Sequence, residues 1–292
     1  LTTDHYPMLH RLIPTNGVTL HTVLDGPEDG PVVLLLHGFP EFWYGWRQQI
    51  PALAAAGFRV LAPDQRGYNL SDRPRALSAY SLDALANDAL GLIDASGRER
   101  VYLVGHDWGA MVAWWVALIA PHRVQRLAIL NVPHPAVMLN HLTTDPAQMS
   151  RSLYAAFFQL PGLPEWLMEA NDWRLLARTL RDTSLPGTFS DADLEEYRRA
   201  WSRPRAMTTM LNWYRALVRR PPAEVSSTRV VVPTTILWGM KDFALRAVMA
   251  EESAALCDDG ELLAFPDNTH WLQHEAAAAV NEALISRFRP QP

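Results

Sequence analysis

This sequence has only one cysteine, no long apolar run and no excess of basic charge, and each of these features excludes a class of protein. The lone cysteine, Cys257, cannot form a disulfide within the chain or supply a cysteine-based metal site, so we expect a small buried apolar residue there. No apolar run reaches the roughly 18 residues that cross a bilayer, and we expect no membrane partner. The chain also lacks the basic, apolar and small-residue pattern of a secretory signal, so we expect a cytoplasmic protein.

Charge and histidine spacing exclude two further kinds of partner. Acidic residues outnumber basic ones by 31 to 26, which gives a net charge of −5, and the arginines are spread along the chain. We therefore expect no nucleic-acid partner. None of the ten histidines forms a pair at metal-ligand spacing with a third ligand, so we expect no metal. A small molecule is the expected ligand, and nothing in the sequence indicates a homo-oligomer.

Apolar runs of strand length alternate with helix-like segments over most of the chain. Asn16-Gly17 predicts a hairpin between two short strands within 8–24. Continuous apolar runs suit strands that are buried on both faces of a parallel sheet. The strand–helix alternation therefore predicts an α/β protein with a mostly parallel central sheet flanked by helices. The expected buried strands are 32–36, 58–62, 101–104, 124–130, 234–238 and 261–265, and the expected helices are 43–56, 81–96, 108–120, 245–256 and 275–288.

The alternation stops after Leu130 and returns only at Thr234. The intervening residues contain short amphipathic segments, such as 191–201 and 206–220, which are typical of helices. We expect a sheet interrupted by a helical insertion. The predicted division is a core of residues 1–133 and 226–292 with a helical cap, or lid, of residues 134–225.

The sharpest local pattern is Gly105-His106-Asp107-Trp108-Gly109, which follows an expected strand and precedes an expected helix. Its spacing matches G-x-nucleophile-x-G, a strained turn that lifts one side chain off the end of a sheet, with glycines relieving the crowding. A carboxylate is a weak nucleophile towards an amide. Asp107 therefore predicts displacement at an sp³ carbon and an ester intermediate. The alternative is that Asp107 is an ordinary helix N-cap.

A base and its orienting acid are expected at the same edge of the sheet. His270 follows the last expected strand across a short loop, and Asp242 follows the preceding strand by a few residues. In open α/β sheets, sites assemble at the carboxyl ends of the strands. We expect His270 to be the general base and Asp242 to fix its tautomer and orientation. The chain order nucleophile, acid, histidine is that of the α/β-hydrolase fold.

Five sequence blocks resemble the epoxide hydrolases of the α/β-hydrolase superfamily, and the resemblance extends over nearly the whole chain. The block that begins at Asp64 departs slightly from the family pattern, because Asn69 stands where a glycine is common. The blocks are His37 to Glu41 with Trp43 and Trp46-Arg47, Asp64 to Tyr68 with Ser71-Asp72, Gly105 to Gly109, Tyr154 with Phe158 to Gly162, and Leu211 to Arg215.

The last two blocks separate this family from its relatives, because a glycine-flanked aspartate also occurs in haloalkane and fluoroacetate dehalogenases. An epoxide oxygen leaves as an alkoxide and needs a proton, which a phenol can supply, whereas a halide needs none. The resemblance implies that Tyr154 and Tyr214 hold and protonate that oxygen. It also implies that substrate contacts come from Phe39, Trp108 and Trp213.

The reaction that the resemblance implies has two steps and needs no cofactor. Asp107 attacks a ring carbon of a small apolar epoxide and leaves a hydroxyalkyl ester. His270, held by Asp242, then activates a water that hydrolyses the ester to a vicinal diol. The backbone amides of Phe39 and Trp108 are expected to form the oxyanion hole.

Two alternatives use the same fold. In a haloalkane dehalogenase with the same Asp-His-Asp triad, Trp108 would donate its indole N–H to the halide, but the second donor of that family is often an asparagine where Phe39 stands. A fluoroacetate dehalogenase would have arginine in place of Trp108. The other alternative is a non-catalytic ligand receptor of the α/β-hydrolase fold, which would usually lack part of the catalytic set.

Overall fold

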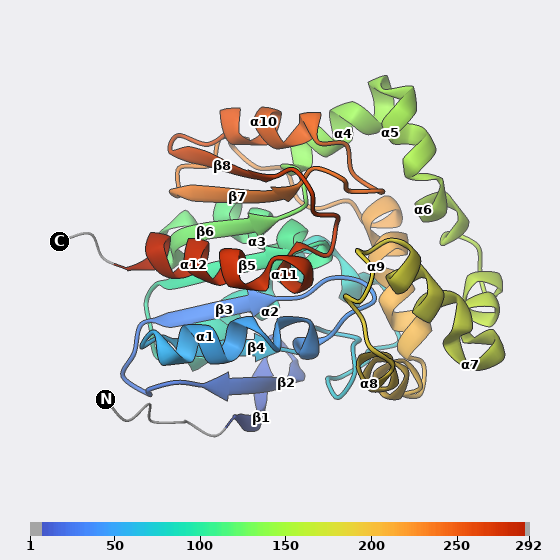
Figure 1. The fold of residues 1–292 in the computed structure, drawn as a ribbon, viewed down its shortest axis with the longest axis horizontal. Coiled ribbons are helices and arrows are strands. Elements are labelled where there is room, and N and C mark those ends of the chain that lie inside the picture. Colours follow the sequence, from blue (N-terminus) through green and yellow to red (C-terminus); the bar gives the residue numbers. More distant parts are fainter. Residues whose placement is uncertain (1–7, 290–292) are drawn as a thin grey trace.

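The computed structural model describes residues 8–289, which form one eight-stranded sheet with helices on both faces and a helical insertion at one end (Figure 1). The strand order is β1-β2-β4-β3-β5-β6-β7-β8. The strands are β1 Leu9–Thr15, β2 Val18–Asp25, β3 Val32–Leu36, β4 Arg59–Pro63, β5 Val101–His106, β6 Val124–Leu130, β7 Thr234–Gly239 and β8 Gly260–Phe265.

Strand direction follows the expected pattern. β1 and β2 form the predicted hairpin, in which Thr15 pairs with Val18 around Asn16 and Gly17. β2 is also antiparallel to β4, and all the remaining neighbours are parallel. The mostly parallel α/β sheet is therefore confirmed, with antiparallel pairing only at the β1–β2–β4 side.

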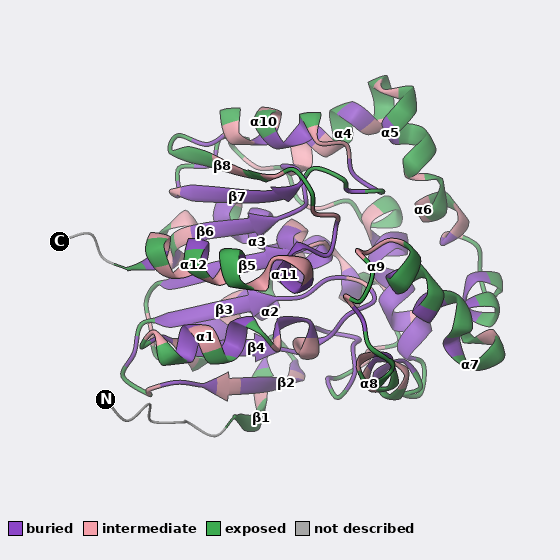
Figure 2. Cartoon of the chain, in the orientation of Figure 1, coloured by how far each residue is buried: buried purple, intermediate pink, exposed green. Residues whose placement is uncertain are grey.

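Helices cover both faces of the sheet because strand side chains alternate between two apolar clusters. Val33 and Leu35 of β3 pack on one face, and Leu34 and Leu36 pack on the other. The first face is covered by α1 Gln49–Ala55, α11 Leu272–Glu275 and α12 Ala277–Phe288, and the second by α2 Leu82–Ala95, α3 Trp108–Ile119 and α10 Val248–Ala255. Figure 2 shows the inner strands β3, β5, β6 and β7 buried between these layers, whereas β8 at the edge of the sheet is partly exposed. The short 3₁₀ helices are η1 Trp43–Trp46, η2 Leu77–Tyr80 and η3 Pro121–Arg123.

The expected continuous helix over 43–56 is wrong in one respect. The structure has the 3₁₀ turn η1 and then the separate helix α1, which begins at Gln49. Pro51 explains the division, because proline is tolerated in the first turn of a helix but lacks the N–H that an interior position donates. A helix running from Trp43 would put Pro51 in its interior.

Six helices lie between β6 and β7, where the insertion is expected. The expected helices at 191–201 and 206–220 correspond to α8 and α9. Figure 1 shows α6 to α9 gathered beyond the ends of the parallel strands, whereas α4 contacts α3 and α10 of the core. Residues 1–7 and 290–292 of the predicted core ranges lie outside the described residues. The six helices are α4 Pro135–Thr144, α5 Pro146–Arg151, α6 Leu153–Phe157, α7 Leu163–Asp182, α8 Asp191–Trp201 and α9 Ala206–Arg219.

Helix α7 consists of two helical halves joined by a left-handed turn. Ala170 has an extended ψ, and Asn171, Asp172 and Trp173 have φ values of 52°, 56° and 60°. Left-handed conformations are unfavourable for residues with a Cβ, so contacts elsewhere must hold this turn. Trp173 supplies one of them, because its buried indole N–H donates to the Ser202 hydroxyl at 2.8 Å.

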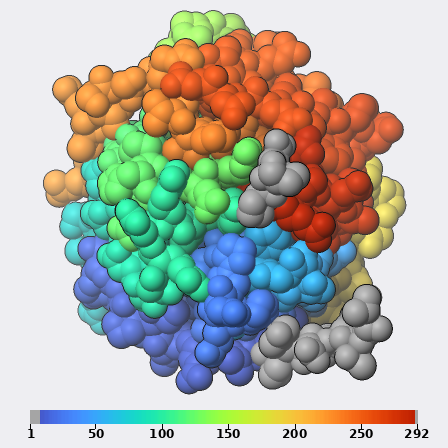
Figure 3. Space-filling view, turned by 90° about the vertical axis from the view of Figure 1, so that its left-hand side faces the viewer, coloured from blue at the N-terminus to red at the C-terminus, as the bar shows by residue number. Residues whose placement is uncertain are grey.

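The surface opposite the insertion belongs to the core. Figure 3 shows this end, where the yellow of the α7–α8 region appears only at one margin.

Cys257 is buried as expected, and burial raises the pKa of its thiol to about 11. Among residues 8–289, no helix combines the length and apolar character needed to span a bilayer.

Candidate active site

The β5–α3 turn places Asp107 at the end of the sheet. Its backbone has φ 50° and ψ −124°, the strained geometry that the glycine-flanked pattern predicts. A Cβ on Gly105 would lie 2.5 Å from the Cα of Ala110, and one on Gly109 would overlap the carbonyl of Leu36. Only glycine at both positions lets helix α3 pack this closely against β5 and β3.

The carboxylate of Asp107 is not used as a helix cap. Asp107 occupies the N-cap position of α3, but its side chain accepts no hydrogen bond from the first turn of that helix. Oδ1 instead accepts the backbone N–H of Phe39, at 2.6 Å. The ordinary N-cap alternative is therefore not supported. The Phe39 amide lies where an oxyanion-hole donor is expected, and Trp108 follows Asp107 directly as the first residue of α3.

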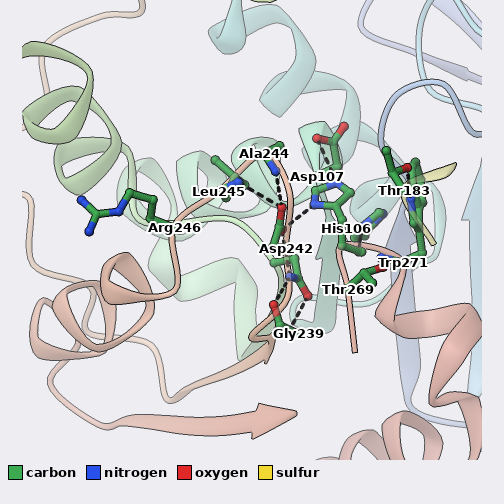
Figure 4. A network of polar contacts seen from close by, with 12 residues as sticks. His106, Asp107, Thr183, Gly239, Asp242, Ala244, Leu245, Arg246, Thr269 and Trp271 are labelled. Atoms are coloured by element: carbon green, nitrogen blue, oxygen red, sulfur yellow. Dashed lines mark hydrogen bonds and ion pairs between the residues drawn. The ribbon is translucent and has the colours of Figure 1, made fainter. Parts of the chain in front are cut away.

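His270 and Asp242 lie at the same edge as Asp107. The His270 Nδ1–H donates to Asp242 Oδ2 at 2.7 Å, and His270 Nε2 is 3.6 Å from Asp107 Oδ2. Asp242 Oδ1 accepts the backbone N–H groups of Ala244 and Leu245 at 2.8 and 2.9 Å (Figure 4). The structure thus brings the three predicted triad residues together, with the acid anchored by its own loop.

The pKa values of this pair reflect burial opposed by neighbouring charge. Burial lowers the pKa of His270, but the two carboxylates of Asp242 and Asp107 outweigh it and raise that pKa to about 10. Burial raises the pKa of Asp242, but the charge and hydrogen bond of His270 outweigh it, so the net shift is downward. With Asp107 ionised, the imidazole is therefore held protonated at neutral pH.

Asp107→Asn removes one of the two charges that raise the pKa of His270, so we expect that pKa to fall from about 10. Because the folded pKa exceeds the ordinary 6.5, the stability that His270 contributes is full below pH 6.5 and is lost as the pH rises through about 10. NMR titration of the His270 ring nitrogens measures this fall in pKa. Asp191→Asn, on the exposed surface of α8, should leave that pKa unchanged. Equal pKa values of His270 in wild type and in Asp107→Asn would contradict the expected fall.

Tyr154 of α6 and Tyr214 of α9 face Asp107 across two cavities that all three residues line. Their ring centres are 6.1 Å apart. Burial raises the pKa of Tyr214 well above its ordinary value, and the neighbouring Tyr154 phenol and the charge of Asp107 add to that effect. Although 38% of Tyr154 is exposed, burial around its phenol and the charge of Asp107 raise its pKa as well. Both phenols therefore keep their protons and can donate hydrogen bonds.

The three expected substrate contacts are placed differently from one another. Phe39 lines the larger cavity, and Trp108 lines the smaller one. Trp213 lines neither, because it points towards the core, where its indole N–H donates to the backbone carbonyl of Arg66 at 3.0 Å. The expectation for Trp213 is corrected. Trp213 lies within α9, one position before Tyr214, and neighbouring helical residues face different sides.

Asn131 is a site residue that the sequence analysis missed. It follows β6 with φ 49°, a conformation that asparagine tolerates, and is fully buried. Its Nδ2 donates to Asp242 Oδ2 at 2.9 Å, and its Oδ1 accepts the N–H of Gly239 at 3.0 Å. An asparagine directly after a strand was the available signal. Its partners lie at the end of β7 and in the loop that follows, and hydrophobic periodicity does not indicate which loops contact each other.

Asn131→Ala should destabilise the protein by about 1–3 kcal/mol, because it leaves buried groups of Gly239 and Asp242 without their partner. Alanine also tolerates the positive φ less well. Urea unfolding measures the change in free energy. Asn140→Ala, at an exposed position of α4, is the matched control and should shift it by less than about 0.5 kcal/mol. Equal stability of the two variants would refute the anchoring role.

A second missed feature is a buried cluster around Glu41. Glu41 Oε1 accepts the Tyr197 hydroxyl at 2.6 Å and His274 Nε2–H at 2.7 Å. His106 Nδ1 lies 3.3 Å from Glu41 Oε2, and His106 Nε2–H donates to the backbone carbonyl of His270 at 2.9 Å. Burial raises the pKa of Glu41, but the two histidines lower it well below its ordinary value. Since Tyr197 belongs to α8, the cluster joins the insertion to the sheet edge.

No group of three or more His, Cys, Asp or Glu side chains within residues 8–289 is arranged to hold a metal ion. Neither cavity is lined by lysine or arginine. The polar groups that meet at the site are therefore the carboxylate, the imidazole and the two phenols, a set suited to nucleophilic displacement with proton transfer.

Comparisons with known proteins agree with this fold. The α/β hydrolase fold family matches residues 31–277. AB hydrolase superfamily protein YfhM of Bacillus subtilis is 43% identical and covers 96% of this chain and 98% of its own. Epoxide hydrolase A of Mycobacterium tuberculosis is 35% identical, with 94% and 95% covered. A variant of an epoxide hydrolase from Bacillus megaterium, complexed with its naphthyloxy-propane-1,2-diol product, has a TM-score of 0.87 at 30% identity, with 95% and 99% covered.

The sheet order, the glycine-flanked turn and these matches define the class of protein. The chain belongs to the α/β-hydrolase family and, within it, to the group that contains the epoxide hydrolases.

Proposed function

We propose that this protein hydrolyses small apolar epoxides to vicinal diols through a covalent ester of Asp107. The observation that carries the proposal is that Tyr154 and Tyr214 line the same two cavities as Asp107. Two protonated phenols opposite a carboxylate suit a leaving group that needs hydrogen-bond donors and a proton. The B. megaterium relative, whose product is a diol, supports the same reading.

In the first step, the Asp107 carboxylate forms a bond to a ring carbon while the bond from that carbon to the ring oxygen breaks. Tyr154 and Tyr214 donate hydrogen bonds to the oxygen, and one phenol transfers a proton to it. The ester that results carries no charge at Asp107. One of the causes that raise the pKa of His270 is thereby removed, so esterification lowers that pKa. The imidazolium then gives its proton back to the phenolate and becomes a neutral base.

In the second step, His270 Nε2 accepts a proton from water as the water oxygen attacks the ester carbonyl of Asp107. Asp242 holds the imidazole through Nδ1 and stabilises the imidazolium. The Phe39 and Trp108 amides stabilise the oxyanion, and loss of one such donor typically costs about 10²-fold to 10³-fold in rate. The bond from the carbonyl carbon to the alkyl oxygen then breaks, and that oxygen takes the proton of the imidazolium as the diol leaves. The new carboxyl group passes its proton to His270, which restores the carboxylate and the imidazolium. No cofactor takes part.

A panel of epoxides and haloalkanes tests this proposal by parallel assays of diol and free halide. We expect diol from the epoxides and little or no halide, because the cavity presents phenols where a leaving oxygen lies and Phe39 where a halide donor is expected. In a single turnover in H₂¹⁸O, the label should enter the Asp107 carboxylate. Release of halide without diol would establish a dehalogenase instead, and no turnover of either class would support a non-catalytic receptor.

A further inference from the structure

Helix α5 of the insertion has one buried side chain, and that side chain is polar. Within Pro146–Arg151 only Gln148 is buried, and it has no exposed surface at all. The helix therefore has no buried apolar side chain to hold it against the rest of the protein. A buried amide group is costly unless its hydrogen bonds are made, so the partners of Gln148 show what α5 is held to.

The partners of Gln148 lie mainly in the loop that carries Asp242. The Gln148 Nε2 donates to the backbone carbonyl of Ala244 at 2.9 Å, and its Oε1 accepts the backbone N–H of Arg246 at 3.1 Å. Nε2 also donates to the Ser152 hydroxyl at 3.0 Å. Two of these three hydrogen bonds therefore fix the backbone of the loop rather than the helix itself.

One of these hydrogen bonds is continuous with the triad. The Ala244 carbonyl belongs to the same peptide group as the Leu245 N–H, which donates to Asp242 Oδ1 at 2.9 Å. Because a peptide group is planar, a bond that holds its carbonyl also fixes the direction of its N–H. Asp242 Oδ2 in turn accepts the His270 Nδ1–H at 2.7 Å. A chain of hydrogen bonds thus leads from Gln148 to the imidazole, and Figure 4 shows its end at Asp242.

The loop lacks the support of regular secondary structure. Residues 242–246, between β7 and α10, belong to no helix or strand. Two further contacts join them to α5 and its N-cap. Arg151 donates to the backbone carbonyl of Asp242 at 3.0 Å, and Arg246 binds the carboxylate of Asp145, the N-cap residue of α5. Both ends of this short helix therefore hold the loop.

We infer that Gln148, supported by Arg151, is a positioning residue that keeps Asp242 aligned with His270 for hydrolysis of the ester. The inference rests on the proposed function. Neither Gln148 nor Arg151 lines the cavities at Asp107, so both act through the loop. Ring opening uses the carboxylate and the two phenols, whereas the second step needs an imidazole that is held in the correct orientation. The effect of Gln148 is therefore confined to the second step.

Gln148→Met tests this inference, because methionine has a similar length but cannot form these hydrogen bonds. Rapid quenching and mass spectrometry follow the rise and decay of the Asp107 ester, with the epoxide of the panel that wild type opens fastest. We expect the ester to form at the wild-type rate. Its hydrolysis should slow by about 10-fold to 100-fold, the effect of a small misplacement of a catalytic group. The ester should therefore accumulate in the variant.

Ser150→Met is the matched control, because it puts the same side chain at an exposed position of α5. Both of its rates should equal those of wild type. Arg151→Met gives an independent readout if Gln148→Met fails to fold, because Arg151 lies at the surface. It removes the hydrogen bond to the Asp242 carbonyl and should slow hydrolysis alone by about fivefold, which corresponds to one hydrogen bond.

The pKa of His270 provides a second measurement. Burial lowers this pKa, and the charge of Asp242 contributes most to raising it to about 10. A misaligned Asp242 should therefore lower the pKa of His270 in Gln148→Met, whereas Ser150→Met should keep the wild-type value. NMR titration of the His270 ring nitrogens measures both. A general loss of structure would reduce the amount of active enzyme without changing the ratio of the two rates.

Equal slowing of ester formation and ester hydrolysis in Gln148→Met would overturn the inference, because it would show that the residue does not act on the second step alone. Unchanged hydrolysis in this variant would overturn it as well, and Arg151→Met decides in the same way if it alone folds. In both cases wild type still forms the Asp107 ester and the diol. A wild type that forms neither would refute the proposed function itself.

Discussion

His270→Gln should stop the reaction after one turnover and leave the substrate bonded to Asp107. Glutamine cannot accept a proton from water, so hydrolysis of the ester should slow by about 10²-fold to 10⁴-fold. Attack on the epoxide needs only Asp107 and the two phenols, and should continue. Mass spectrometry of the peptide that contains Asp107 should then show an added mass equal to that of the epoxide, in an amount equal to the enzyme.

The matched control is His122→Gln, at an exposed position of η3, beyond the end of α3 that lies away from Asp107. It should turn over as wild type does and accumulate no adduct. An inactive His270→Gln with no added mass on Asp107 would contradict the two-step reaction. An adduct that is hydrolysed at the wild-type rate would show that His270 is not the base.

Replacing Tyr154 and Tyr214 together by phenylalanine should reduce epoxide opening by about 10²-fold to 10⁴-fold, because the leaving oxygen then has no proton donor. Each single variant should lose less, since one phenol remains. The rings stay, and with them the packing of Tyr214 against Trp108 and Phe39, whose ring centres lie 4.9 and 5.5 Å away. The fold should therefore be intact. Single-turnover adduct formation measures the first step directly.

Tyr102→Phe is the matched control for a lost hydroxyl, because its hydroxyl accepts a hydrogen bond from Gln125 and its ring packs on Phe288, on the α12 side of the sheet. It should leave the rate of adduct formation unchanged. If the double variant opens epoxides within tenfold of wild type, the tyrosines are not the acids. If it is slow on epoxides but releases halide from haloalkanes, the site is better suited to halide displacement.

Local sequence patterns were sufficient for the sheet, the turn and the positions of the triad. β3 and β5 are continuous apolar runs because both their faces are covered, and the glycines beside Asp107 are required wherever a helix turns this sharply off a strand. Asp242 and His270 were placed correctly at the sheet edge because parallel strands end there together.

Other features depend on contacts between distant segments. Asn131 contacts the Gly239–Asp242 loop, and Glu41 contacts residues from α8 and α11, partners that the composition around each residue does not indicate. The left-handed turn in α7 likewise depends on a hydrogen bond from Trp173 to Ser202, across the insertion. For Trp213, the family resemblance implied a substrate contact, but the rotation of α9 directs the side chain to the core.

The sequence by itself determined an α/β sheet with an inserted helical segment and a carboxylate on a strained turn, because these follow from local periodicity and backbone sterics. The tertiary structure alone decided that Tyr154 and Tyr214 meet Asp107 at the junction of two unequal cavities. The shape of a cavity depends on how helices from separate parts of the chain pack together. No local pattern encodes that arrangement.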